Sequence, residues 1–379
     1  MACLKKILNY FQNTVTPIDL LKSKFCKQKG KIKIGWCSVF PPIENGAAAF
    51  SYYFVKELMK NSEFEVYAIP VNNKIKKSAF KGIKFAKINN KKLDVVVFWC
   101  LGDLLPKYFN KCKCKKIAWQ TMHYTQESEK LMEYLKKCDN VLFPTKSALK
   151  WHNLPNAQYL PLGTKIELFK TKKSDREIIF VSRSHYYKGM IPFLQTIPLV
   201  VNKHANAIFR LHSPIDKNTP HKEEIQKTIE EMQHRFPNNF FFENKWQKYK
   251  EMPSIYENAG ILLFPSNNEG FGVPLVEAMA SETVCIVPDA APMNELVLNN
   301  KTGFCIKYER NIEQQYHGFK FPHPKDMANK INYLLDNFEI LDKMKKNSKI
   351  RAEKEYSMKK CVSEFTNIVK KVLNETANN

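Results

Sequence analysis

The sequence predicts an α/β protein with two domains, each built on a parallel sheet that helices cover on both faces. Three observations support this fold class. The chain has 379 residues, which is enough for about two domains with full cores. Short apolar runs typical of buried strands alternate with helical patterns along most of its length. A polar segment over 169–175 interrupts this alternation, and we place the domain boundary there.

Each half of the chain has its own series of predicted elements. In the first half, strands are predicted over 31–36, 64–69, 93–101, 116–120, 140–144 and 158–162, with helices over 47–60, 128–137 and near Ser147. In the second half, strands are predicted over 177–182, 207–212, 240–243, 261–264 and 284–287. A last helix is predicted over 359–373. We therefore divide the chain into an extension (1–30), a first domain (31–170), a second domain (171–355) and a terminal helical segment (356–379).

Composition places the chain among cytoplasmic globular proteins. Its hydrophobic fraction is 44%, and no apolar run approaches the roughly 18 residues that a membrane span requires. The N-terminus lacks the features of a secretory signal. Ten cysteines are scattered along the chain, and the closest couple, Cys112 and Cys114, has no histidine nearby. We expect reduced thiols and no zinc site.

The formal net charge of +23 raises the question of a nucleic-acid partner. The lysines are spread along the whole chain and no nucleic-acid-binding motif is present, so no such partner is expected. Near the N-terminus, Leu4, Ile7, Leu8 and Phe11 recur at helical spacing beside lysines. Such a segment suits peripheral contact with an anionic membrane, and the alternative is a helix packed on the first domain.

The segment over 266–280 is the most informative stretch of the chain. It joins a buried strand that ends at Pro265 to a helix that begins at Pro274. Gly270 and Gly272 flank Phe271 and allow the backbone to approach a ligand closely. The free N–H groups at the start of the helix point into the same space with a partial positive charge. An anionic diphosphate would fit there.

Two carboxylates belong to this segment, Glu269 in the loop and Glu277 in the first helical turn. A carboxylate accepts two hydrogen bonds side by side, and a vicinal diol offers two donors at matching spacing. The pattern resembles the E-x7-E signature of retaining glycosyltransferases of family 4, which have the two-domain GT-B fold. The resemblance implies that Glu277 binds the ribose diol of a nucleotide and that Glu269 binds the hydroxyls of the transferred sugar.

A second element of the same resemblance opens the second domain. Arg183 and Lys188 follow a predicted strand and resemble the family's R-x4-K-G element, whose cations hold the donor diphosphate. Negative charge grows on the leaving diphosphate as the glycosidic bond breaks, so cations are required there. The chain contains no Asp-x-Asp triplet, the usual metal-binding pair of other glycosyltransferases. We therefore expect no metal and no other cofactor.

The first domain contributes two further candidates. Gly46 lies in a loop that resembles the family's first glycine-rich loop, with Ala47 where a second glycine is common. His123 follows a predicted strand and resembles the family histidine that lies near the reacting sugar. The segment over 161–169 resembles the hinge-side element, with Lys165 where an aspartate is common, and has no assigned role. In this fold the terminal helix crosses back to the first domain, and we expect the same here.

The resemblance predicts two sets of site residues. The donor-binding set is Gly46, Arg183, Lys188, Gly270, Phe271, Gly272, Val273 and Glu277. The catalytic set is Arg183, Lys188, Glu269 and His123.

These residues imply a metal-independent, retaining hexosyltransferase. It would move a sugar from a nucleoside-diphosphate sugar to a hydroxyl of a glycan, lipid-linked or protein-linked acceptor. One alternative is a sugar-nucleotide epimerase of similar fold, which would need no acceptor. Another is a non-catalytic basic binding protein on a decayed fold, which would have lost the site residues. An oxidoreductase is disfavoured, because the partial dinucleotide fingerprint over 270–275 has Leu275 in place of its third glycine.

Overall fold

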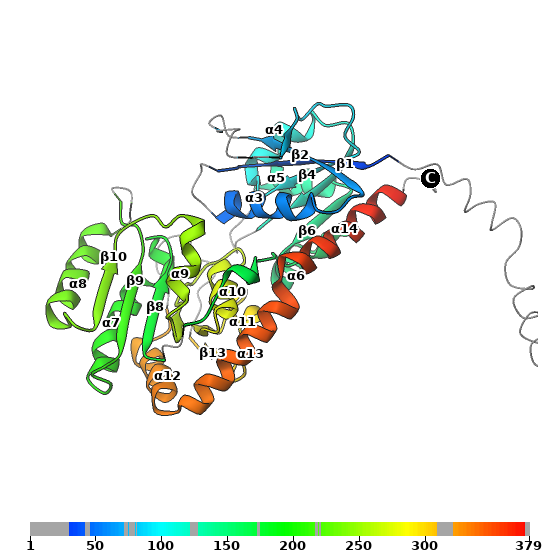
Figure 1. Ribbon diagram of the computed structural model, residues 1–379. Coiled ribbons are helices and arrows are strands. Elements are labelled where there is room, and N and C mark those ends of the chain that lie inside the picture. Colours follow the sequence, from blue (N-terminus) through cyan, green and yellow to red (C-terminus); the bar gives the residue numbers. More distant parts are fainter. Residues whose placement is uncertain are drawn as a thin grey trace, which may run out of the picture.

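The computed structural model of the protein describes residues 30–41, 46–71, 75, 80, 82–121, 128–172, 175–216, 219, 221–308 and 321–375. Two separate sheets organise this part of the chain (Figure 1). The first sheet has seven strands in the order β3-β2-β1-β4-β5-β6-β7, and the second has six in the order β10-β9-β8-β11-β12-β13. Every strand pair in both sheets is parallel.

The first domain alternates strands and helices as its sequence pattern predicts. Its strands are β1 (Ile32–Ser38), β2 (Phe64–Pro70), β3 (Lys84–Phe85), β4 (Val95–Trp99), β5 (Lys115–Trp119), β6 (Asn140–Phe143) and β7 (Ala157–Tyr159). Its helices are α3 (Gly46–Leu58), α4 (Leu105–Phe109), α5 (Glu129–Lys136) and α6 (Lys146–His152), with short 3₁₀ turns η2 (Gly102–Leu104) and η3 (Ile166–Leu168). All five residues of β4 are buried, as expected of a central strand covered on both faces.

The second domain repeats this architecture. Its strands are β8 (Glu177–Val181), β9 (Ile208–His212), β10 (Phe240–Glu243), β11 (Ile261–Leu263), β12 (Val284–Pro288) and β13 (Gly303–Ile306). Its helices are α7 (Met190–Val201), α8 (Lys222–Arg235), α9 (Met252–Tyr256), α10 (Val273–Ala280), α11 (Met293–Leu296) and α12 (Pro324–Asp336), with 3₁₀ turns η4 (Tyr186–Lys188) and η5 (Tyr249–Glu251). The carboxyl ends of these parallel strands face the first domain, which is where ligands bind in such sheets (Figure 1).

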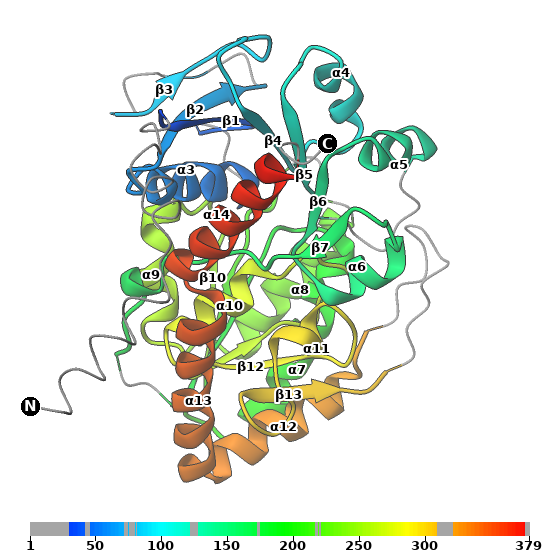
Figure 2. The same ribbon diagram turned by 90° about the vertical axis from the view of Figure 1, so that its right-hand side faces the viewer.

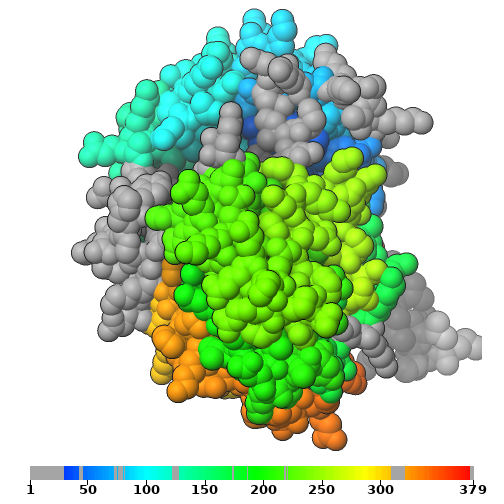
Figure 3. Space-filling model, turned by 90° about the vertical axis from the view of Figure 1, so that its left-hand side faces the viewer, coloured from blue at the N-terminus to red at the C-terminus, as the bar shows by residue number. Residues whose placement is uncertain are grey.

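Two long helices end the chain. The helix α13 (Phe338–Tyr356) runs along the second domain, and α14 (Met358–Asn374) continues across to pack beside α3 (Figures 1 and 2). Phe365 of α14 enters the aromatic core of the first domain, where its ring lies 6.2 Å from Trp36, 5.2 Å from Phe54 and 5.9 Å from Trp119 between centroids. The terminal helix therefore ties the two domains together, as predicted. Figure 3 shows the first domain in blue and cyan above the second in green.

The predicted fold class is confirmed, and a few elements differ from the prediction. The short strands β3 and β13 were not predicted. The first sheet ends at Tyr159 and the second begins at Glu177, so the polar segment lies between them. Within the described residues, no helix is long and apolar enough to cross a membrane. The extension over 1–29 lies outside the described residues, so its proposed membrane contact stays a prediction.

Candidate active site

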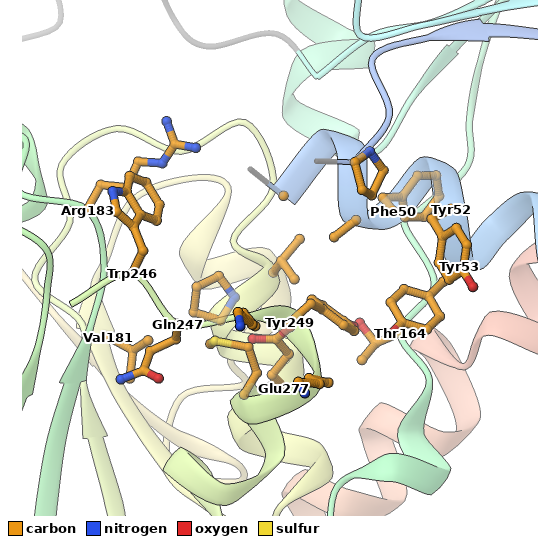
Figure 4. Close-up of a pocket in the computed structure, with 18 of the residues that line it drawn as sticks. Phe50, Tyr52, Tyr53, Thr164, Val181, Arg183, Trp246, Gln247, Tyr249 and Glu277 are labelled. Atoms are coloured by element: carbon orange, nitrogen blue, oxygen red, sulfur yellow. The ribbon is translucent and has the colours of Figure 1, made fainter. Parts of the chain in front are cut away.

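A cavity of about 550 Å³ lies between the two domains. The helix α3 of the first domain forms one wall (Figure 4). The other wall consists of the segments that follow β8, β9 and β10 and of the N-terminal end of α10. Of the predicted site residues, Gly46, Arg183, Val273 and Glu277 line this cavity. The fold thus brings together residues that lie more than two hundred positions apart in the sequence.

The two loops of the predicted donor site pack directly on each other. Gly189 begins α7 with φ +75°, and a β-carbon there would lie 2.7 Å from the carbonyl oxygen of Pro265. Only glycine allows this conformation together with this close approach. The backbone N–H of Asn267 also donates to the carbonyl of Tyr187 at 2.8 Å. The relative position of the Arg183 loop and the Glu269 loop is therefore fixed by backbone contacts.

Lys188 and Glu269 form an ion pair where these loops meet. The ammonium of Lys188 contacts Oε1 of Glu269 at 2.5 Å and donates to the carbonyl of Asn268 at 3.3 Å. Their side chains are 11% and 10% exposed. Neither residue is among those that line the cavity. In this arrangement each charge is neutralised by the other before any ligand is bound.

Glu277 is the second predicted carboxylate, and it is almost completely buried at 2% exposure. The hydroxyl of Tyr256 donates to its Oε2 at 3.0 Å. Burial raises the pKa of Glu277 to about 8 and outweighs this hydrogen bond, which lowers it. The helix α10 begins at Val273, one residue earlier than predicted, so Glu277 is its fifth residue and lies just beyond the first turn.

Arg183 stands on the opposite side of the cavity from α3 (Figure 4). Its guanidinium carbon lies 4.9 Å from the ring centroid of Trp246, a stacked cation–π geometry that holds the exposed side chain along the wall. Arg183 can therefore present its N–H donors to an anion in the cavity. The indole that orients it comes from the segment after β10.

The glycine-rich loop contributes mainly through its backbone. Gly272 caps α10 with φ +100°, a conformation that other residues rarely adopt. The side chain of Phe271 is buried, and its ring lies 6.1 Å from that of Tyr356 between centroids. Phe271 therefore belongs to the core, and only its main chain is available to a donor. Gly270 is buried as well. Val273 is the member of this loop that reaches the cavity.

The first domain supplies an aromatic wall. Phe50, Tyr52 and Tyr53 of α3 line the cavity, and the ring of Tyr53 lies 4.7 Å from that of Tyr249 in the second domain between centroids (Figure 4). Gly46 begins α3 at the rim, and a β-carbon there would meet no atom within 4 Å. His123 lies outside the described residues, so its predicted role stays a prediction.

The segment after β10 was missed in the sequence analysis. Trp246, Gln247 and Tyr249 all line the cavity, as does the buried His212 at the end of β9. Glu243 accepts a hydrogen bond from Gln247 at 3.2 Å and lies 3.5 Å from Nδ1 of His212. Burial lowers the pKa of His212, which favours its neutral form. The sequence offered one indication of them. These residues lie at or just after the ends of predicted strands, and ligands bind at the carboxyl ends of parallel strands.

Comparison with known protein families concerns mainly the second domain. The family model of the glycosyl transferases group 1 matches residues 164–351, which contain the Arg183 loop and the Glu269 segment. Residues 164–351 are thus similar to the glycosyl transferases group 1. This match supports the predicted enzyme class, a glycosyltransferase.

Individual relatives match only parts of this chain or share only its fold. The O-antigen chain mannosyltransferase RfbU of Salmonella typhimurium is 43% identical over 51 residues, 14% of this chain and 14% of that protein. A glycosyltransferase from Rickettsia africae has 15% identity and a TM-score of 0.72, covering 90% of this chain and 99% of that one. Anabaena HepE, solved with UDP and glucose, has 12% identity and a TM-score of 0.71, covering 90% and 100%. The GT-B fold is confirmed by these structures.

Proposed function

We propose that the protein is a retaining, metal-independent hexosyltransferase of family 4 that uses a nucleoside-diphosphate sugar. The observation that carries the proposal is that Arg183 and Glu277 line one interdomain cavity, while the Lys188–Glu269 pair joins the two loops to which Arg183 and Glu269 belong. Two cations and two carboxylates there match the needs of a diphosphate and two diols. The similarity of residues 164–351 to the glycosyl transferases group 1 supports the assignment.

Each group has a distinct task in this proposal. Arg183 and Lys188 bind the diphosphate and stabilise the charge that grows on it as the bond to the sugar breaks. Lys188 leaves Glu269 when it contacts the diphosphate, which frees the Glu269 carboxylate to accept hydrogen bonds from the sugar. Glu277 binds the ribose diol as a carboxylate, so donor binding releases a proton from it at neutral pH. The N-terminal N–H groups of α10 add a partial positive charge at the diphosphate.

Two relatives support a class of donor. HepE was solved with UDP and glucose, and RfbU is named a mannosyltransferase. Both names concern hexoses, so a nucleoside-diphosphate hexose is the proposed donor class. The cavity volume of about 550 Å³ is within the usual range for ligand sites of this size.

The acceptor is proposed to enter from the first domain. The aromatic side chains of α3 offer flat apolar faces on which a sugar ring of a glycan or a lipid-linked glycan packs. His123 is proposed to contact the reacting sugar from this side. The enzyme is proposed to work in the cytoplasm, with the N-terminal extension as the candidate for contact with an anionic membrane.

A screen of UDP- and GDP-hexoses tests the proposal, with release of nucleoside diphosphate and transfer to a mixture of glycan acceptors as readouts. We expect one donor to be consumed with an acceptor present and the product to keep the anomeric configuration of the donor. Consumption of the donor at the same rate without an acceptor, with a changed sugar configuration, would instead favour the epimerase. A protein that melts at the same temperature with every donor would favour the non-catalytic alternative.

A further inference from the structure

A second pocket, of about 730 Å³, lies in the second domain between α12, α13 and the turn that precedes β13. These elements are at the end of the domain that points away from the first domain (Figure 1). None of the residues that line it also lines the interdomain cavity. A ligand in this pocket would therefore occupy a site separate from the donor and acceptor sites of the proposed reaction.

Three lysines from three different elements converge on this pocket. Lys301 comes from the turn, Lys330 from α12 and Lys343 from α13. The lining contains no aspartate or glutamate, and its other polar side chains are two asparagines and a tyrosine. Because three exposed lysines line one concave site with no carboxylate among them, an anion that enters the pocket would be attracted by all three.

Two neighbouring lysines of α13 differ from the three in the pocket, because each has a carboxylate partner. On α13, Lys345 pairs with Asp175, and Lys349 pairs with Glu282 at 2.7 Å. In the part of the chain that the structure describes, Lys301, Lys330 and Lys343 form no such ion pair. None of the three lysines that line the pocket therefore has a carboxylate partner within 4 Å among the described residues.

The remaining lining gives the pocket a defined shape. The ammonium of Lys330 lies 4.7 Å from the ring centroid of the buried Phe304, and Tyr333 packs edge-on against the same ring at 6.0 Å. Tyr333 keeps 42% of its surface exposed, so its ring is available to a flat ligand group. Asn347 donates to the carbonyl of Lys301 at 3.2 Å and holds the turn against α13.

We propose that this pocket binds a small phosphate-bearing molecule of about nucleotide size. Ammonium groups bind phosphate oxygens as point charges, and three of them suit a group with more than one negative charge. The aromatic and aliphatic part of the lining suits the organic part of such a molecule. The pocket volume is within the usual range for cofactor-sized ligands.

Calorimetric titration with inorganic pyrophosphate tests the proposal. Native protein is expected to bind two equivalents, one in each site. Lys330→Ala/Lys343→Ala is expected to lose one binding event or weaken it at least tenfold, and Arg183→Ala is expected to weaken the other. Lys354→Ala is the matched control, because it removes an exposed charge from the far part of the same helix without touching the pocket. Circular dichroism verifies that all variants remain folded.

The outcomes separate the possible sources of the phosphate. Pyrophosphate binding without binding to phosphatidic acid vesicles would assign a soluble ligand. Vesicle binding that the double variant loses and the Lys354→Ala variant keeps would assign a lipid headgroup. The proposal would be overturned if the double variant and the control bound pyrophosphate equally. It would also be overturned if native protein bound pyrophosphate only in the interdomain cavity. None of these readouts depends on sugar transfer, so the proposed function can fail or hold independently.

Discussion

Lys188 and Glu269, which are 81 positions apart in the sequence, form an ion pair with both side chains only about a tenth exposed. Partly buried charges of this kind are costly without a partner, so each keeps the other in place in the absence of a ligand. In the proposed reaction the diphosphate replaces Glu269 as the partner of Lys188. Donor binding therefore has to break this ion pair. Two contacts replace it, one between Lys188 and the diphosphate and one between Glu269 and the sugar.

Replacing Lys188 with alanine tests its role at the diphosphate. Lys188→Ala is expected to lower kcat by about a hundredfold or more, because one cation that stabilises the leaving group is lost. Native enzyme is expected to keep its activity in EDTA. Steady-state kinetics with and without EDTA measure both effects.

The control for this variant is Lys203→Ala, which removes a lysine from a more exposed ion pair with Asp336. Its kcat is expected to stay at the native value, since exposed ion pairs contribute little. Native enzyme that loses activity in EDTA and regains it with Mn²⁺ would refute metal independence.

The buried Glu277 makes stability depend on pH. Its pKa is about 8 in the folded protein and 4.5 without the fold, so the folded state holds a proton that the unfolded chain has lost. The contribution of Glu277 to the free energy of unfolding is therefore expected to be greatest below about pH 4.5 and to fall toward pH 8, by at most about 1.4 kcal/mol per pH unit. Denaturant titrations of native protein and of Glu277→Gln at several pH values isolate this contribution.

Glu277→Gln keeps the shape of the side chain and removes the titration. The difference in the free energy of unfolding between native protein and the variant is therefore expected to shrink as pH falls. The same substitution is expected to weaken nucleotide binding by about 1.5–3 kcal/mol, since a charged hydrogen-bonding partner of the ribose is lost. Native affinity is expected to increase toward pH 8, where the carboxylate is more populated. If the free energy of unfolding changed with pH in the same way in native protein and in Glu277→Gln, the raised pKa of Glu277 would be contradicted.

The fold could be predicted well because strands and helices are marked by patterns within short stretches of sequence. Apolar runs such as 95–99 indicate strands buried on both faces, and β4 is buried throughout. The start of α10 was predicted within one residue because a proline and a glycine mark it. The two-residue β3 carries too short a pattern to be recognised.

The site was predicted in part, and the missing part has a physical reason. The Glu269 and Arg183 motifs are short and continuous, so the sequence displays them directly. Trp246 and Tyr249 reach the cavity only because the second domain faces α3, a relation that no local pattern encodes. The burial of Phe271 was also missed, because a phenylalanine between two glycines gives no sign of the core beneath it.

Gly189 is expected to be intolerant of a side chain. Gly189→Ala places a β-carbon at φ +75° and 2.7 Å from the Pro265 carbonyl, so it should destabilise the protein by about 1–3 kcal/mol or displace the Lys188 loop. Gly46→Ala is the matched control, because its β-carbon meets nothing within 4 Å. Thermal unfolding of both variants measures the difference. Equal melting temperatures would show that the loop around Gly189 accommodates the added β-carbon without loss of stability.

His123 gives a prediction for the acceptor side. His123→Ala is expected to impair transfer strongly while donor binding stays within a few tenths of a kcal/mol, since closure of the domains brings the first domain to a sugar already bound. Calorimetry of donor binding and the transfer rate of the same variant provide the two readouts. Transfer at the native rate would make His123 a structural residue.

Glu295 gives a prediction about how the two domains are held together. Its carboxylate lies in α11 of the second domain and accepts the first two N–H groups of α6 in the first domain, from Lys146 at 2.7 Å and from Ser147 at 2.8 Å. These donors have no partner within their own helix, and a negative charge there is favourable. Arg351 donates to the backbone carbonyl of Glu295 at 2.8 Å and so anchors α11 to α13.

Glu295→Ala removes this contact between domains, which is expected to cost about 0.5–2 kcal/mol. The free energy that holds the domains together falls, so the ligand-free protein should open and its radius of gyration in X-ray scattering should increase. Saturating donor should restore the compact form, and the KM for the donor should therefore rise more than kcat falls. The exposed Glu353 on α13 provides the control for loss of one negative charge. If Glu295→Ala and Glu353→Ala give the same scattering and the same KM, the contact does not control the relative position of the domains.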